Sequence, residues 1–355
     1  MCSSDLQIVY DDEDLRNYMG EAVKVSPEHP ILIDKFLEDA IEVDADAVAD
    51  GHSVVVGGVM EHIEKAGIHS GDAACALPPY SLGEEQVRAL RAQTKALAGA
   101  LGVVGLINVQ FAIRNDAVYV LEVNPRASRT IPFVSKAIGV PLAKVAMRAM
   151  LGHPVSAIAS VEAREPDHIA VKESVFPFIK FPGVDVVLGP EMKSTGEVMG
   201  IDHDFRKAYL KAQVAAGSTL PTSGKVFISV KNRDKRVVMT LAKRLAEMGF
   251  GLVATGGTAR VLERHGMTVE VIHKVGAGYR PNVVDLMKRG EIALVFNTPE
   301  DGRARKDSAL IRRTAVAQQI PYYLTVDGIQ AAIGAIEALL KEEQGATSLQ
   351  EYHRG

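Results

Sequence analysis

The sequence predicts a two-part protein, in which an α+β region is followed by an α/β region built on a parallel sheet. Up to about residue 215, strand patterns, a helix and an antiparallel hairpin follow one another in mixed order, which is typical of an α+β domain. After residue 223, strand and helix patterns alternate strictly, which is typical of a parallel sheet covered on both faces. The length of 355 residues suits two domains at roughly 100–200 residues each.

The first region is expected to open with two strands, at 31–36 and 41–49. In the second of these, Glu42, Asp44 and Asp46 alternate with apolar residues. This alternation predicts a half-buried strand with one acidic face.

A turn and a helix are expected next along the chain. The turn Asp50-Gly51-His52 predicts a returning strand over 53–60. Ser81, followed three residues later by Glu84, predicts a helix that begins with a capping box. The helical spacing ends at Gly102.

A hairpin over 106–124 gathers polar side chains, with Gln110 in its first strand and Glu122 and Asn124 in its second. A three-residue loop at 114–116 would place all three on one face. A two-residue loop would point Gln110 and Glu122 to opposite faces and would rule out a shared metal site. We predict the three-residue loop. These oxygen donors suit Mg²⁺ or Mn²⁺ where nucleotide phosphates complete the ligand set. The alternative is that they form the solvent-exposed polar face of an ordinary hairpin.

Two further clusters could carry chemistry in the first region. Arg126 and Arg129 follow the hairpin directly and are expected to face phosphate or carboxylate groups. The stretch 61–72 is dense in titratable residues, but His62 and His69 lack a third ligand at metal-like spacing. On spacing alone, that stretch is interpreted as an ordinary polar loop.

The second region starts after a small, polar, proline-containing stretch at 216–223, which is the predicted linker. Thr255-Gly256-Gly257-Thr258 follows a strand and opens a helix, which favours an anion site with Lys235 as a counter-charge; simple turn chemistry is the alternative.

Residues 343–355 are expected to form a frayed tail. Strands are expected at 225–230, 250–255, 267–272, 292–296 and 321–326, and helices at 234–248, 257–265, 281–289, 304–319 and 327–342. A basic stretch, expected to be a solvated helix face or the lining of an anion site, comprises Arg303, Arg305, Lys306, Arg312 and Arg313.

Composition argues against several classes of function. The net charge is −4, aromatic residues make up 5% and tryptophan is absent, so no basic field or stacking platform for nucleic acid is expected. No apolar run reaches the ~20 residues of a membrane helix. Two cysteines cannot build a disulfide framework, which favours a reducing compartment, the cytoplasm or an organelle matrix.

Four ordered motifs, at 34–44, 60–72, 108–111 and 122–129, resemble the large chain of carbamoyl-phosphate synthase. The resemblance covers nearly the whole chain and corresponds to the C-terminal third of the family. It implies a partial ATP-grasp domain over 1–215 and a methylglyoxal-synthase-like allosteric domain over 224–342. The subdomain and the glycine-rich phosphate loop that open an ATP-grasp domain do not fit before residue 31, so we expect a chain that is inactive alone.

The resemblance implies an ATP-dependent ligase that phosphorylates carbamate to carbamoyl phosphate, for arginine and pyrimidine biosynthesis. Such phosphoryl transfer works by positioning and charge neutralisation, and needs no nucleophile motif. The implied cofactors are ATP and Mg²⁺ or Mn²⁺, and the implied partners are the remainder of the large chain and a glutaminase small subunit. The residues implied to bind nucleotide are Lys35, Leu37, Glu42, Gly67, Ile68, His69, Ser70, Gln110 and Glu122; those implied to bind metal are Gln110, Glu122 and Asn124; and Arg126 and Arg129 are implied to contact phosphate or carbamate.

The resemblance also implies control by small molecules. Tyr322 matches an aromatic position of the family's ornithine site, but Leu324 stands where a hydroxyl would help, so a nucleotide effector such as UMP is favoured over ornithine. The loop 297–302 replaces the glycine-rich loop of true methylglyoxal synthase, which argues against lyase chemistry. An alternative function is a nucleotide-binding regulatory module without catalysis. The implied effector residues are Lys235, Thr255, Thr258, Lys274, Asn297 and Ser308 for the nucleotide, and Glu64, Asp72 and Glu173 for amine groups.

Overall fold

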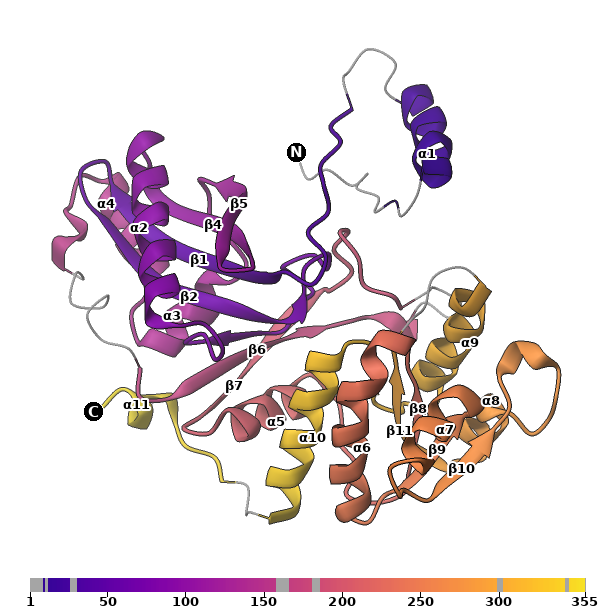
Figure 1. Ribbon diagram of the computed structural model, residues 1–355. Coiled ribbons are helices and arrows are strands. Elements are labelled where there is room, and N and C mark those ends of the chain that lie inside the picture. Colours follow the sequence, from indigo (N-terminus) through magenta and orange to yellow (C-terminus); the bar gives the residue numbers. More distant parts are fainter. Residues whose placement is uncertain are drawn as a thin grey trace.

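The computed structural model describes residues 9, 12–25, 31–157, 166–180, 186–298, 303–341 and 345–354. They form a seven-stranded sheet with the order β5-β4-β1-β2-β3-β6-β7 and a five-stranded sheet with the order β10-β9-β8-β11-β12 (Figure 1). The strands of the first sheet pair antiparallel and those of the second pair parallel. The predicted order of an α+β region followed by a parallel sheet is therefore confirmed.

The antiparallel sheet has one continuous apolar face. Alternate residues of the two central strands, such as Val43 and Phe111, pack on Leu90 of the helix that covers this face. On the opposite face, two shorter helices cover only one end of the strands. The strands are β1 (Ile41–Asp50), β2 (Val54–Lys65), β3 (Cys75–Leu77), β4 (Val104–Arg114), β5 (Ala117–Asn124), β6 (Ile169–Val175) and β7 (Gly196–Asp202); the first helix is α2 (Glu84–Ala100), and the other two are α3 (Ile131–Ile138) and α4 (Leu142–Met150).

The acidic face of β1 differs from its prediction. Its residues alternate as expected, but Asp44 and Asp46 are only 2% and 0% exposed. The strand is therefore buried on both faces, and the prediction of a half-buried strand is wrong. The physical reason is that loops after β2 and β5 cover the polar end that α3 and α4 leave open.

The hairpin between β4 and β5 has a two-residue turn, so the predicted three-residue loop is wrong. Arg114 pairs with Ala117, and the two residues between them have positive φ angles of 50° and 63°, as in the turns that close tight hairpins. A register shift then follows Gln110, which leaves Leu121 as an extra residue. This bulge places Gln110 directly opposite Glu122, on one face, which the two-residue turn alone would not have done.

Three smaller sequence predictions are also wrong. Residues 31–37 form no strand, and Leu32 is 84% exposed. The helix α2 is preceded by Gly83 as its N-cap, while the predicted cap, Ser81, donates its hydroxyl to Glu61 instead. In the basic stretch, Arg313 is exposed, but Arg312 is fully buried, so the solvated face is wrong for Arg312 and the alternative of an anion-site lining stays a prediction; the side chains of the residues at 303–307 and the backbone of 299–302 lie outside the described residues.

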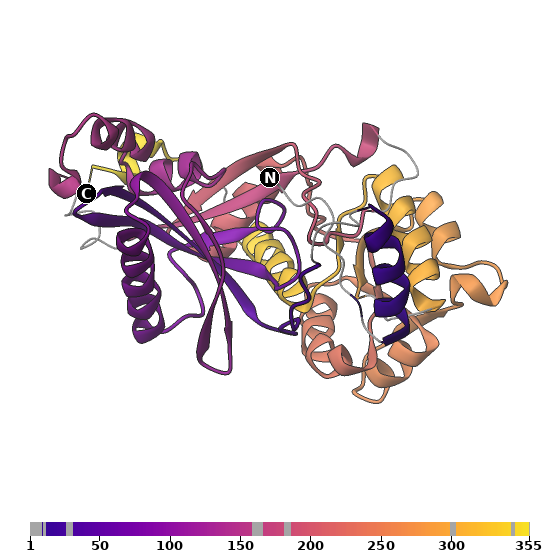
Figure 2. The ribbon, with the colours of Figure 1, turned by 90° about the horizontal axis from the view of Figure 1, so that it is seen from above.

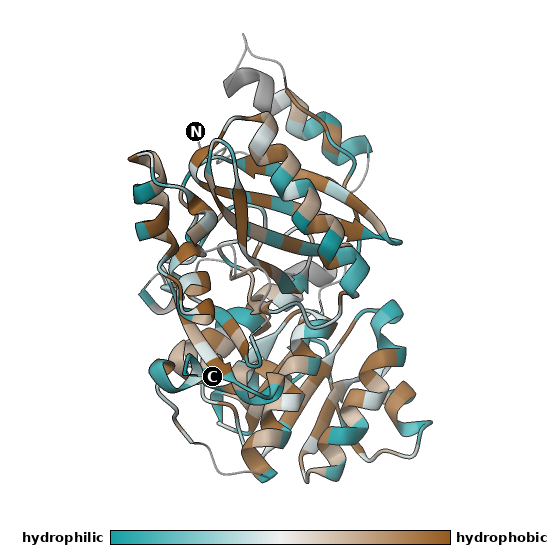
Figure 3. Cartoon of the chain, turned by 90° about the vertical axis from the view of Figure 1, so that its left-hand side faces the viewer, coloured by the Kyte–Doolittle hydropathy of each residue, from teal (hydrophilic) through white to brown (hydrophobic). Residues whose placement is uncertain are grey.

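Each strand and helix predicted for the second region has a counterpart in the structure, although the strand expected at 321–326 is only two residues long and Val326 already belongs to the next helix. The sheet has helices on both faces, and hydrophobic residues concentrate along the strands of both sheets (Figure 3). The strands are β8 (Lys225–Ser229), β9 (Gly251–Thr255), β10 (Val269–Ile272), β11 (Ile292–Asn297) and β12 (Tyr322–Tyr323), and the helices are α6 (Lys235–Glu247), α7 (Gly256–Glu263), α8 (Val283–Lys288), α9 (Arg303–Ala317) and α10 (Val326–Lys341). In the described part of the chain, no helix is both long and apolar enough to cross a membrane.

The two sheets share one apolar core. The helices α10 and α5 (Phe205–Ala215) pack together between them (Figures 1 and 2). The shared core includes Ile63 and Val171 of the antiparallel sheet and Phe296 of the parallel sheet. Leu220, in the stretch predicted as a linker, is 3% exposed and belongs to the same core. The stretch forms neither helix nor strand, and its other residues are exposed or partly buried, so Leu220 alone attaches it to the core.

The C-terminal residues return to the antiparallel sheet. Residues 349–352 form the short helix α11 (Leu349–Tyr352). The Tyr352 hydroxyl donates to the Ile201 carbonyl over 3.2 Å, and His353 Nε2 lies 2.8 Å from the Lys136 carbonyl. The prediction of a frayed tail is therefore wrong for residues 345–354, because aromatic residues anchor them.

Candidate functional site

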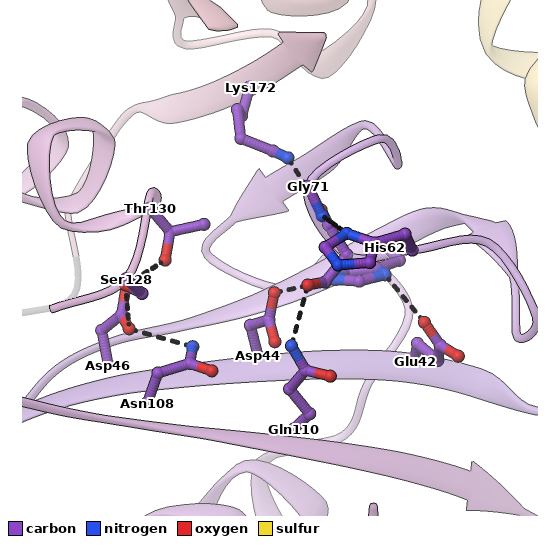
Figure 4. A network of polar contacts seen from close by, with 12 residues as sticks. Glu42, Asp44, Asp46, His62, Gly71, Asn108, Gln110, Ser128, Thr130 and Lys172 are labelled. Atoms are coloured by element: carbon purple, nitrogen blue, oxygen red, sulfur yellow. Dashed lines mark hydrogen bonds and ion pairs between the residues drawn. The ribbon is translucent and has the colours of Figure 1, made fainter. Parts of the chain in front are cut away.

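A polar floor covers one end of the antiparallel sheet, between the helices and the loops (Figure 4). It is formed by side chains that the pairing brings together. Asp44 lies opposite Gln110, which lies opposite Glu122. One step along, Asp46 lies opposite Asn108, which pairs in turn with Asn124 on β5.

The loop 66–72 is held directly over this floor. Gln110 Nε2 donates to Ser70 Oγ over 2.8 Å, and the Gly67 amide donates to Glu42 Oε1 over 3.2 Å. From the other side, the fully buried Lys172 donates to the Ser70 carbonyl over 3.0 Å. Gly67 has a φ of 111°, which favours glycine. The interpretation of an ordinary polar loop is wrong, because both strand side chains and a buried lysine fix this one.

His62 is a buried cation beside the floor. It is 3% exposed, with Nε2 3.1 Å from Asp44 Oδ2 and Nδ1 3.3 Å from Glu42 Oε2. Burial acts to lower the pKa of His62, but the hydrogen bonds and charges of the two carboxylates outweigh it and raise the pKa to about 9. The imidazolium therefore balances two carboxylates at neutral pH.

The predicted metal ligands lie on one face and suit a hard cation. Gln110 uses its amide nitrogen for Ser70, so its carbonyl oxygen remains as an available ligand atom. Glu122 is exposed and Asn124 is 7% exposed. Within the described residues, no group of three or more histidine, cysteine or acidic side chains forms a metal cage. The set fits an ion that takes its remaining ligands from phosphate oxygens, as Mg²⁺ usually does.

The two predicted arginines lie on the segment that leaves the floor, residues 125–130. Arg129 donates to Ser194 Oγ over 3.0 Å, and the same hydroxyl donates to the Gly71 carbonyl over 2.9 Å. Arg129 is therefore joined to the loop over the floor. Arg126 is exposed and donates to the adjacent Ala127 carbonyl over 3.1 Å.

Other residues that the resemblance implies to bind nucleotide lie outside the strands. Lys35 is exposed and Leu37 is partly buried, in the irregular segment that precedes β1. His69 accepts a hydrogen bond from the Gly71 amide over 3.0 Å and so shapes the loop from within. Ile68 points to a different cavity.

That cavity lies where the two sheets meet and has a volume of about 650 Å³. The three acidic residues predicted to bind amines, Glu64, Asp72 and Glu173, line it. Burial, and then the charge of Glu64, raise the pKa of Glu173 to about 8. Its carboxylate accepts a hydrogen bond from Gln213 over 2.6 Å. The remaining lining includes Ile68, Phe176, Phe178, Tyr322 and Leu324.

A second large cavity, of about 870 Å³, opens at the carboxyl ends of the parallel strands. The structure brings together all of the residues predicted to bind a nucleotide effector. Thr255 is the N-cap residue of α7, and Lys235 begins α6 and donates to Asn232 over 2.6 Å. Hydroxyl groups and backbone N–H groups at such a place favour an anion. The predicted residues that line the cavity are Lys235, Thr255, Thr258, Lys274, Asn297 and Ser308.

Sequence reasoning missed several residues of the first site. His62 and Asp46 were noticed only as titratable or acidic positions, and their contacts depend on strand register. Lys172 stands between Val171 and Glu173, and no sequence pattern indicates that its side chain is buried. Ser128 and Thr130, which bond to Asp46, had no such signal either.

The two sheets, the polar floor and the strand-end cavity define an ATP-grasp domain joined to a methylglyoxal-synthase-like domain. The family model described as "Carbamoyl-phosphate synthase L chain, ATP binding domain" matches residues 4–158, and the one described as "MGS-like domain" matches residues 237–324. A curated relative from Methanosarcina barkeri, "Carbamoyl phosphate synthase large chain", is 51% identical over 350 residues, which cover 98% of this chain and 88% of the relative. The chain therefore belongs to the carbamoyl phosphate synthase large chain family.

Relatives of the same name are longer than this chain. The one from Archaeoglobus fulgidus is 54% identical over 349 residues, which cover 98% of this chain and 32% of the relative. The one from Neisseria meningitidis serogroup A is 54% identical over 349 residues, with the same coverage of both chains. This chain thus spans about a third of the length of these two relatives. Among solved structures, the biotin carboxylase domain of a thermophilic 2-oxoglutarate carboxylase is similar at a TM-score of 0.45 and 17% identity, over 58% of this chain and 53% of its own.

Proposed function

We propose that this chain carries the site at which carbamate is phosphorylated by ATP to give carbamoyl phosphate. The observation that supports this most strongly is the direct pairing of Gln110 with Glu122 beneath Ser70, with Arg129 joined to the same loop. This arrangement offers oxygen ligands, hydroxyl and amide donors, and guanidinium groups around one space. In this proposal the site acts together with the remainder of the large chain and with a glutaminase small subunit.

Each residue has a defined task in the proposed reaction. Gln110, Glu122 and Asn124 hold a divalent cation, Mg²⁺ or Mn²⁺, which neutralises phosphate charge when bound. Arg126 and Arg129 orient the transferred phosphoryl group and the carbamate, because a guanidinium pairs with two oxygens at once. The fixed loop 66–72 places its backbone against the nucleotide. Catalysis then depends on positioning and on electrostatics rather than on a covalent intermediate.

Calorimetric titration of the purified chain with ATP tests this proposal. We expect binding that requires Mg²⁺ and that falls at least about tenfold in Glu122→Ala and in Gln110→Ala. Glu85→Ala is the matched control, since this carboxylate is exposed on α2, on the other face of the sheet. Binding that is independent of Mg²⁺, or equal in all four proteins, would contradict the proposal.

A second role concerns the parallel-sheet domain, and we propose that its cavity binds a nucleotide effector such as UMP. The observation that favours it is the convergence of four buried polar side chains, Thr255, Thr258, Asn297 and Ser308, with two lysines around one cavity. If UMP binds while ATP does not, the chain is better described as a regulatory module without catalysis. We propose a domain division at 216–223, with this nucleotide domain over 224–342.

A further inference from the structure

A fully buried aspartate organises the segment that carries the two arginines (Figure 4). Asp46 lies on β1 and is 0% exposed. Its Oδ1 accepts hydrogen bonds from Asn108 Nδ2 over 3.0 Å and from Ser128 Oγ over 2.8 Å. Its Oδ2 accepts one from Thr130 Oγ1 over 2.5 Å. One carboxylate thus joins β1, β4 and the segment 125–130.

The segment 125–130 depends on these contacts for its position. All of its residues are described, and they form neither helix nor strand between β5 and α3. Thr130 is the N-cap residue of α3, but its side chain does not cap the helix, because the hydroxyl donates to Asp46 instead. The Ser128 and Thr130 hydroxyls also lie 2.8 Å from each other. Ser128 and Thr130, whose hydroxyls donate to Asp46, are the two residues on either side of Arg129 in the chain.

The choice of a carboxylate at this position has a cost. Burial raises the pKa of Asp46 to about 6, although the hydrogen bond from Thr130 acts in the opposite direction and lowers the pKa. An apolar side chain would fill the same space without that cost. A buried polar group whose hydrogen bonds are all formed holds its bonding partners in one arrangement. Here those partners are the two hydroxyls beside Arg129.

We propose that Asp46 is a positioning residue for Arg129, and that it acts through the hydroxyls of Ser128 and Thr130. The inference rests on the proposed function, in which this arginine faces the phosphoryl group. Asp46 itself is fully buried beneath the segment. Its effect on ATP binding therefore passes through Arg129, and this distinguishes it from a residue that only stabilises the fold.

A double-mutant cycle with calorimetric ATP titration tests the inference. ATP with Mg²⁺ is titrated in the presence of saturating UMP, so that the parallel-sheet cavity does not contribute. We expect Asp46→Asn to lower the affinity about tenfold in the otherwise unchanged chain, and less than about threefold when Arg129→Ala is already present. An equal loss in both backgrounds would overturn the inference, since a general loss of structure does not depend on Arg129.

A second pair of variants keeps the test decisive if Asp46→Asn does not fold. Thr130→Val removes one hydroxyl while it keeps the shape of the side chain, and Thr130→Ser restores the hydroxyl. We expect the valine variant to lose several-fold in affinity and the serine variant to regain it. Equal affinity of the valine and serine variants would also overturn the inference.

The outcomes separate this inference from the proposed function. If Arg129→Ala alone leaves the affinity for ATP unchanged, the proposed role of the arginine fails, and the inference fails with it. If Arg129→Ala lowers the affinity but Asp46→Asn and Thr130→Val do not, only the inference fails. Circular dichroism of each variant confirms that the folded protein is compared.

Discussion

The two candidate nucleotide sites of this chain are built in opposite ways. The floor on the antiparallel sheet consists of side chains that strand pairing brings together from β1, β4 and β5, and it includes buried ionisable groups, Asp44 and Asp46, with the buried His62 beside them. The cavity of the parallel sheet lies at the strand ends, and its buried polar groups, such as Thr258 and Asn297, are neutral. We therefore expect the charged groups of the floor to affect both the stability of the fold and the shape of the site. In the cavity, we expect binding and stability to change separately.

The test with the largest expected effect is the removal of the buried imidazolium of His62. We expect His62→Ala to lower the free energy of unfolding by about 4 kcal/mol, because Asp44 and Glu42 lose their counter-charge. His273→Ala is the matched control from the parallel-sheet cavity, where the side chain is exposed. It should cost less than about 0.5 kcal/mol. Urea unfolding measures both, and similar losses would remove the contrast between the two sites.

The next test probes the packing of the antiparallel sheet against α5. A Cβ atom at Gly200 would lie 2.0 Å from the Ala208 carbonyl oxygen and 2.4 Å from the Ala212 nitrogen. Backbone atoms cannot move aside as a flexible side chain can, so we expect Gly200→Ala to cost about 3 kcal/mol. Gly217→Ala has no atom within 4 Å of its Cβ but has a φ of 86°; it should cost about 1 kcal/mol through its backbone alone. Thermal unfolding compares the two, and an unaltered Gly200→Ala protein would contradict the close approach.

The third test uses pH. The pKa of His62 is raised from 6.5 in the unfolded chain to about 9 in the folded protein. Its contribution to stability is therefore complete below pH 6.5 and is lost as the pH rises through 9. We expect His62 alone to contribute a fall of about 2 kcal/mol in the free energy of unfolding between pH 7 and pH 9, on top of any contribution from Glu173, whose pKa of about 8 lies in the same range. His62→Gln should flatten this part of the profile, and an unchanged slope in that variant would assign the pH dependence to other groups.

The smallest expected effect belongs to the parallel-sheet cavity. Thr258→Ala removes one buried hydroxyl and should weaken UMP binding about fivefold, which is the worth of one hydrogen bond. Thr258→Ser keeps the hydroxyl and should bind as the unaltered chain does. The unfolding temperature should change little in either variant. A large loss of stability in Thr258→Ala would mean that this site, like the floor, couples binding to folding.

The contrast also explains what could be predicted from the sequence. Local reasoning identified one part of the parallel-sheet cavity, the stretch 255–258 with Lys235, because these residues lie where a strand ends or a helix begins. Lys274, Asn297 and Ser308 were implied only by the family resemblance, and all six residues line the cavity. The location of Thr255 at the start of a helix, for example, follows from the glycine pair after it. The carboxyl ends of parallel strands then bring these residues to one edge.

The floor could be predicted only in part, because it depends on long-range register. The shared face of Gln110 and Glu122 was expected from a three-residue loop, yet it arises from a tight turn and the bulge at Leu121. No local pattern reveals such a bulge, since it is selected by the contacts on both sides of the strand. The burial of Asp46 was missed for a similar reason, because its partners Ser128 and Thr130 are more than 80 residues away in the chain.

The return of the C-terminus to the antiparallel sheet has a mechanical consequence. The chain leaves the antiparallel sheet through α5 and Leu220 and comes back to it through Tyr352 and His353. Between these two places, α10 packs on α5 inside the shared core. A rotation of the parallel sheet against the antiparallel sheet would therefore have to open that core as well as release the C-terminal contacts.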